Sequence, residues 1–132
     1  MAITLVWDKM QRNLLWIRLH EQLTWEDFRD LMERGPGMVR EHVGRVDLIV
    51  LAEVPPPRGN PFPMLSDALR YLRELEHVRV IAAVDPFLGS MMRSSLQMMV
   101  RVMLPQRAAR FHFVSSTEEA LALVNEDRQR EA

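Results

Sequence analysis

The stretch Phe111-His112-Phe113-Val114-Ser115-Ser116-Thr117-Glu118-Glu119 joins a short apolar strand to the start of a capped helix, which continues as Ala120-Leu121-Ala122-Leu123-Val124. The same succession of strand and helix recurs three times upstream. Strands linked through helices run parallel and use right-handed crossovers, so a chain of such repeats has few foldable outcomes. The sequence therefore predicts an α/β fold.

The strands upstream predict how the sheet is arranged. Ile3–Trp7 and Leu14–Leu19 flank a polar turn, which is typical of an antiparallel hairpin. Leu48–Ala52 and Val80–Val84 are apolar on both faces, as central parallel strands usually are. We expect residues 1–132 to form a single domain with a five-stranded mixed sheet, the opening hairpin strand at an edge, helices on both faces, and the order β-β-α-β-α-β-α-β-α.

Three helix boundaries follow from proline and glycine. Gly35-Pro36-Gly37 is expected to interrupt or kink the helix that Thr24 caps. A second helix is expected over Met64–Glu76. Asp85-Pro86 predicts a cap and first turn, so a long helix should span Pro86–Leu104. Residues 126–132 are polar and are expected to fray.

Composition narrows the class of protein. The 132 residues suit one core, 48% of them are apolar, and cysteine is absent, which excludes disulfides and thiolate metal sites. The net charge is −1 and no aromatic residues interleave with the basic ones, so no nucleic-acid partner is expected. No apolar run approaches the ~18 residues of a membrane span. These features predict a soluble, cytoplasmic protein without a transmembrane segment.

The element order and the closing Ser-Thr-Glu-Glu-Ala-Leu helix resemble the STAS domains, and in particular the stand-alone SpoIIAA-like group. The resemblance covers about residues 2–125. It implies a regulatory domain that binds a protein partner, on a fold shared with lipid carriers of the CRAL-TRIO kind.

One segment departs from the family pattern. Antagonist STAS domains carry Asp-Ser-Ser/Thr-Gly after the third strand, where a kinase phosphorylates the hydroxyl. Here Glu53-Val54-Pro55-Pro56-Pro57 stands in that place, and Ser66 is the first hydroxyl that follows. We therefore expect no phosphoswitch at the usual position and keep Ser66 only as a weak candidate.

The sequence contains no catalytic motif. Its histidines lack metal-ligand spacing, and nucleophile elbows, P-loops and glycine-rich dinucleotide turns are absent. Carboxylates are scattered, so no acid/base pair can be nominated. Asp85 ends a central strand, where open α/β sheets bind ligands, although a helix cap is its commoner role. We predict no enzyme activity, no catalytic residue, no metal and no cofactor.

The helix expected over Pro86–Leu104 has an unusually wide apolar arc of about 200°. Met91, Met98 and Val102 lie together at one margin, beside Arg101. Packing on a neighbouring helix of the same fold, a homodimer contact, a partner protein or an apolar ligand could cover that margin. Methionine suits adaptable contacts. We predict self-association or binding of a protein partner through this helix.

Two functions remain open. The leading hypothesis is a non-catalytic regulatory or protein-interaction domain acting through the long methionine-rich helix. The alternative is a carrier or sensor of a small apolar or lipid-like ligand, held beneath the proline-rich loop of residues 55–64. A cavity of a few hundred Å³ there favours the carrier. The candidate binding residues are Phe62, Met64, Asp85, Phe87, Met91, Arg93, Met98, Arg101 and Val102.

Overall fold

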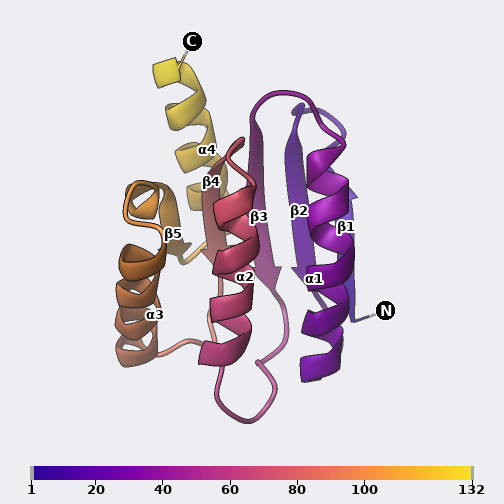
Figure 1. Ribbon diagram of the computed structural model, residues 1–132, viewed down its shortest axis with the longest axis vertical. Helices are drawn as coiled ribbons and strands as arrows, with labels where there is room; N and C mark the ends of the chain where they lie inside the picture. Colours follow the sequence, from indigo (N-terminus) through magenta and orange to yellow (C-terminus); the bar gives the residue numbers. More distant parts are fainter. Residues whose placement is uncertain (1, 132) are drawn as a thin grey trace.

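Five strands lie side by side in their sequence order in the computed structural model, which describes residues 2–131 (Figure 1). They are β1 (Ile3–Trp7), β2 (Leu14–Leu19), β3 (Val46–Ala52), β4 (Val78–Val84) and β5 (Phe111–Val114). β1 is antiparallel to β2, and every other neighbouring pair is parallel. The predicted mixed sheet, its opening hairpin and the central places of β3 and β4 are therefore confirmed.

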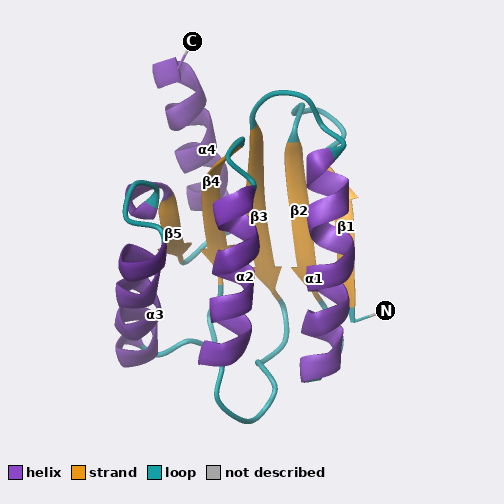
Figure 2. Cartoon of the chain, viewed as in Figure 1, coloured by secondary structure: helices purple, strands orange, loops and turns teal. Residues whose placement is uncertain are grey.

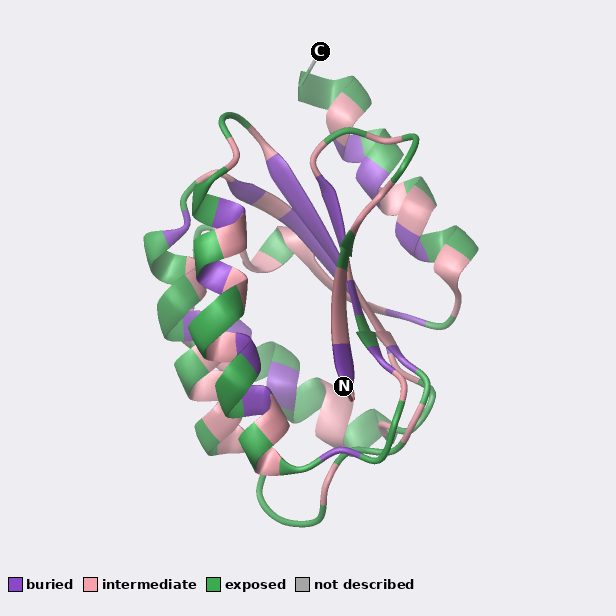
Figure 3. Ribbon diagram, turned by 90° about the vertical axis from the view of Figure 1, so that its right-hand side faces the viewer, coloured by how far each residue is buried: buried purple, intermediate pink, exposed green. Residues whose placement is uncertain are grey.

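The helices form two unequal layers. They are α1 (Trp25–Arg40), α2 (Phe62–Glu74), α3 (Ser90–Met103) and α4 (Thr117–Glu131), with a short 3₁₀ turn, η1 (Ala108–Arg110), before β5 (Figure 2). α1, α2 and α3 lie on one face of the sheet, and α4 lies on the other (Figure 3). Helices on both faces were predicted, but the division of three against one was not.

Alternation along β3 and β4 supplies both halves of the core. Leu48 and Ile81 pair in register and face the three-helix layer. Ile49 and Ala82, one residue further along, pair in register and face α4, where Val124 covers them. Two apolar layers therefore sandwich the sheet, which explains why these strands are apolar on both sides.

α1 continues through Gly35-Pro36-Gly37, so the predicted interruption is wrong. Pro36 removes one backbone donor from the helix, but its ring is buried, and burial of apolar surface offsets part of that loss. Thr24 and Asp27 cap the start of the helix reciprocally, as a capping box. The capping box and the buried side chains of one face stabilise the helix enough for it to continue through Pro36.

α3 begins at Ser90 and not at Pro86. The Asp85 Oδ1 accepts a hydrogen bond from the Phe87 N–H at 2.9 Å, which makes a local turn. Asp85 therefore caps that turn, and Gly89 occupies the N-cap of the helix without a side-chain bond. α2 is also shifted: it begins at Phe62, two residues before the predicted start, and ends at Glu74.

The end of the chain is ordered as helix. Residues 126–131 belong to α4, so the predicted fraying is wrong for them, and residue 132 lies outside the described residues. Asp127 is buried and forms ion pairs. Paired charges, which hydropathy alone does not reveal, hold this turn in place. No helix between residues 2 and 131 is long and apolar enough to cross a lipid bilayer.

Candidate functional site

An apolar cavity of ≈ 250 Å³ lies between the sheet and the three-helix layer. Strand residues Leu15, Leu48 and Ile81 line it on one side, and Leu31 of α1 and Leu69 of α2 line it on the other. Each of these side chains belongs to the buried core. The cavity is thus lined by core side chains and is partly open at the surface.

One end of the cavity lies beneath the proline-rich loop. Val54, Pro56 and Pro61 line it there, together with Met64 at the start of α2. These residues follow the carboxyl end of β3, the side of an open α/β sheet on which ligands usually bind. The loop appears at the foot of the molecule in Figure 1, between β3 and α2.

Trp25 fixes this loop to α1. Its indole Nε1 donates to the Arg58 carbonyl oxygen at 2.7 Å. Gly59 has φ +116°, and a Cβ there would come within 3.2 Å of the Trp25 Nε1. Only glycine adopts this conformation readily, and any other residue would also crowd the indole. The loop is therefore held over the cavity by a specific contact.

Among residues 2–131, Asp85, at the carboxyl end of β4, is the one lining residue with a charged side chain. Burial raises the pKa of its carboxyl group above the ordinary aspartate value, although backbone hydrogen bonds from Phe87 and Leu88 and the charge of Arg93 act in the opposite direction. The Arg93 guanidinium donates to the Asp85 backbone carbonyl at 3.3 Å. It does not form an ion pair with the carboxylate.

A second hollow of ≈ 550 Å³ lies between α1 and α2. The residues that line this hollow and not the cavity are largely charged and include Arg29, Glu33, Asp67, Arg70 and Glu74. The side chains that line both hollows are Trp25, Phe28, Met32, Met64 and Tyr71. These apolar and aromatic residues therefore form the boundary between the outer groove and the cavity.

The predicted cavity residues divide into two groups. Met64 and Asp85 line the cavity. Of the residues that the structure describes, Phe62 and Phe87 line neither hollow: Phe62 is half-buried at the start of α2, and Phe87 is 44% exposed. Leu88 lines the cavity instead of its neighbour, because the turn at Asp85 directs the chain differently from the expected helix.

α3 carries an exposed apolar stripe. Met91, Met98 and Val102 are 85%, 63% and 76% exposed, so none of them packs on a neighbouring helix of its own chain. Leu96 and Val100 form the buried side of the helix. The stripe lies apart from the cavity, because α3 contributes only Leu96 to the cavity lining.

The arginines near α3 differ in their surroundings. Arg101 is exposed beside the stripe, and Arg93 is half-buried against Asp85. Arg107 donates to the backbone carbonyls of Leu75, Val78 and Leu72, and Arg110 pairs with Asp127. Three of the four arginines in residues 86–117, namely Arg93, Arg107 and Arg110, therefore form hydrogen bonds or ion pairs within their own chain.

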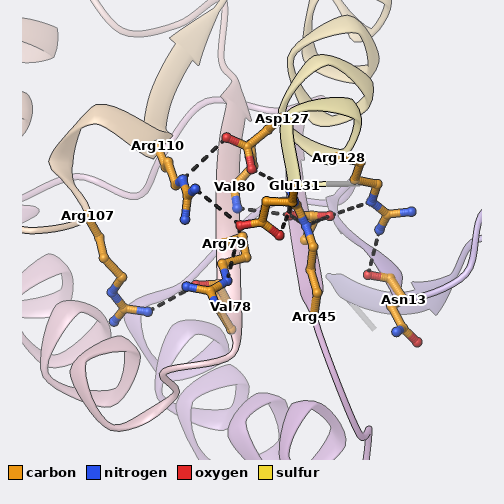
Figure 4. A network of polar contacts seen from close by, with 11 residues as sticks. Asn13, Arg45, Val78, Arg79, Val80, Arg107, Arg110, Asp127, Arg128 and Glu131 are labelled. Atoms are coloured by element: carbon orange, nitrogen blue, oxygen red, sulfur yellow. Dashed lines mark hydrogen bonds and ion pairs between the residues drawn. The ribbon is translucent and has the colours of Figure 1, made fainter.

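A buried polar network occupies the opposite end of the sheet, and sequence reasoning missed it (Figure 4). Asp47 is fully buried. Its carboxylate lies 2.9 Å from the Arg45 Nη2 and 2.7 Å from the Arg128 Nε, and it accepts from the Val80 N–H at 2.9 Å. The signal in the sequence was an acid within a doubly apolar strand, because such a group needs partners.

The network continues along α4. Asp127 lies 2.8 Å from the Arg45 Nη2 and 3.3 Å from the Arg110 Nε, while Glu131 pairs with Arg45 and Arg110 at 2.9 and 3.2 Å. These contacts, together with the Arg79–Glu131 ion pair at 3.7 Å, join the last turns of α4 to η1, to β4 and to Arg45, the residue before β3 (Figure 4). No group of acidic, histidine or cysteine residues within residues 2–131 is arranged to hold a metal ion.

No protein-family model matches the chain, and no curated protein matches it in sequence. Among solved structures, the anti-sigma factor antagonist SpoIIAA in its unphosphorylated form is similar, with a TM-score of 0.51 and 13% sequence identity. The superposition covers 99% of this chain and 98% of SpoIIAA. The SpoIIAA-like fold that the sequence predicts is confirmed, and the likeness extends to the fold alone.

Proposed function

We propose that this SpoIIAA-like domain is a non-catalytic regulatory domain whose state is set by a small apolar molecule bound between the sheet and the three-helix layer. The cavity of ≈ 250 Å³ carries this proposal. Protein cores contain few voids larger than a water molecule. The hollow is partly open at the surface, so water can contact its apolar wall in the free protein. An apolar molecule that displaces this water buries apolar surface, so an occupant is favoured.

The chemistry of the lining suits binding. Its polar groups are the Asp85 carboxyl and the tips of Trp25 and Tyr71, and the Trp25 N–H already bonds to the loop. Nucleophilic catalysis needs a nucleophile in contact with an activating group, and no such pair lines this cavity among the described residues. An apolar wall with one or two polar points instead matches a ligand site that orients its guest.

Native mass spectrometry of the freshly purified protein tests this function. We expect a bound species of low mass that extraction with organic solvent removes, together with a lower melting temperature after extraction. The control is Ala83→Ile, which fills part of the cavity wall and should be purified without the species. Protein that is empty as purified and melts at the same temperature with every apolar compound offered would contradict the proposal.

A second candidate function is association of two copies through α3. The observation that favours it is the exposed stripe of Met91, Met98 and Val102. An identical patch on both copies can close a two-fold contact, and methionine side chains adapt to such a surface. The stripe and the cavity are separate, so association and ligand binding could occur in one protein.

The association test places a charge in the stripe. We expect Met98→Glu to convert a dimer into a folded monomer in light scattering, with little change in the melting temperature because the side chain is exposed. Gln97→Glu adds the same charge at the neighbouring exposed position and should leave the dimer intact. A wild-type protein that stays monomeric at high concentration would exclude this candidate.

A further inference from the structure

The cavity wall has one charged group, and the fold does not need that charge. The Asp85 side chain accepts the Phe87 N–H within a turn of the kind that asparagine forms equally well. Burial works against the charged state of the carboxyl group and raises its pKa. An asparagine would make the same turn without the penalty of burying a charge.

Asp85 also has no cationic partner. Among the ion pairs of the described residues, none involves its carboxylate. Arg93 is the nearby cation, but its hydrogen bond goes to the backbone carbonyl of Asp85, and Arg93 does not line the cavity. Asp47 offers the contrast, because its buried carboxylate is paired with two arginines. The partner that Asp85 lacks is a cation on the cavity side.

We propose that the cavity binds an amphiphilic amine, with its hydrocarbon body among the core side chains and its ammonium group paired with Asp85. This inference rests on the ligand-binding function proposed above and names the chemical class of the ligand. An ammonium group offers three donors to the carboxylate, and charge-assisted hydrogen bonds of this kind are among the strongest in proteins. An alkyl carboxylate would meet a like charge at the same point.

The size of the cavity limits the hydrocarbon part. A cavity of about 150 Å³ holds benzene, which has six carbon atoms. By the same proportion, ≈ 250 Å³ holds about ten non-hydrogen atoms. A straight chain of eight carbons with a terminal amine falls within this limit. Its chain would lie against leucine, isoleucine and phenylalanine side chains such as Leu48, Ile81 and Phe28.

The test compares octylamine, octanol and octanoate, which share a chain length and differ in the head group. We expect isothermal titration calorimetry at neutral pH to give the tightest binding for octylamine and the weakest for octanoate. The preference for the amine over the alcohol should be roughly tenfold to a hundredfold, the range for a hydrogen bond to a charged group. Asp85→Asn should abolish that preference and leave the affinity for octanol unchanged.

Glu21→Gln is the matched control. Glu21 follows the carboxyl end of β2, is exposed and does not line the cavity. Removing its charge should leave the amine preference intact, which excludes general attraction between an amine and an acidic surface. Equal binding of octylamine and octanol to the wild type, or an amine preference that survives Asp85→Asn, would overturn the head-group inference while leaving the cavity as a ligand site. Failure of all three compounds to bind would overturn both.

Discussion

The carboxylates at the two ends of the sheet, buried Asp47 and half-buried Asp85, have opposite surroundings. At the amino ends of β3 and β4, Asp47 is fully buried and surrounded by arginines and a backbone donor. At the carboxyl ends, Asp85 lies at the wall of a cavity with no cation paired to its carboxylate. One end is filled with paired groups, and the other is hollow.

The difference separates structure from function within one small sheet. The buried Asp47 carboxylate fixes α4 against the strands, and its oxygens are already bonded to groups of the protein, so they are not available to a ligand. A carboxylate that caps one local turn and has no paired cation, beside an apolar hollow, joins no distant segments of the free protein. Natural proteins retain such groups where binding requires them, because activity and stability often compete.

The largest effect on the free energy of unfolding is expected from removing the contacts of Asp47. Asp47→Ala leaves the half-buried Arg45 and Arg128 without their shared counter-charge and removes the acceptor of the Val80 N–H. Such losses typically cost about 3–5 kcal/mol. We expect urea unfolding to show this loss, or the variant to be unfolded. Glu74→Ala breaks the exposed pair with Arg40 and should cost less than about 1 kcal/mol. Similar losses in both variants would contradict the comparison.

Two adjacent alanines in β4 test whether the sheet face that lines the cavity is less densely packed than the face that contacts α4. Ala82 is fully buried and faces α4, so Ala82→Ile should overpack that face and cost about 1–3 kcal/mol. Ala83 lines the cavity, so Ala83→Ile should add about 0.5–2 kcal/mol of stability by filling it. Thermal unfolding measures both. If the two variants shift the melting temperature in the same direction, the two faces do not differ in packing.

The loop contact gives a smaller effect that sharpens the comparison. Trp25→Phe removes the hydrogen bond to Arg58 and should cost about 1 kcal/mol while speeding ligand release. Trp16→Phe also removes an indole hydrogen bond, from the Trp16 Nε1 to the Asp8 Oδ1 at 2.8 Å, and should cost at least as much, because the acceptor is a carboxylate, without changing release. Stopped-flow dissociation of octylamine measures the rate. Equal rates in the two variants would show that the loop does not control the cavity.

The smallest effect concerns the charge of Asp85. Because its pKa is raised in the folded state, the folded protein holds that proton more tightly than the unfolded chain. Its contribution to stability is therefore lost as the pH rises from the ordinary aspartate range through the raised pKa. We expect Asp85→Asn to remove this decline and to be more stable than the wild type at neutral pH. Parallel urea-unfolding profiles from pH 3 to 8 for the two proteins would contradict this expectation.

Much of the fold could be predicted because its signals are local. Apolar runs on both faces of β3 and β4 require central positions, and the strand order follows from short connections. Helix ends were less predictable. Pro36 is tolerated because tertiary burial outweighs its local preference, and the turn at Asp85 competes with a helix cap for the same side chain.

The cavity and the polar network depend on contacts between distant segments. The sequence pointed to the loop and to Met64 and Asp85, but the walls come from four strands and three helices, whose spacing no local pattern encodes. Asp127 and Arg128 read as part of a polar tail until Asp47 is known to lie beside them. Phe62 and Phe87 do not line the cavity, and hydrophobicity alone could not show this, because it does not give a side chain its direction.

The pairing of Asp47 with Arg128 joins residues 81 positions apart. During translation, at about 5–20 residues per second, roughly 4–16 s separate the synthesis of the two side chains. Each parallel strand can pair with its predecessor as it emerges, but the face that carries Asp47 and Ile49 is covered only when α4 arrives. We therefore expect the nascent chain to present an uncovered, partly charged sheet face to chaperones until α4 has left the ribosome.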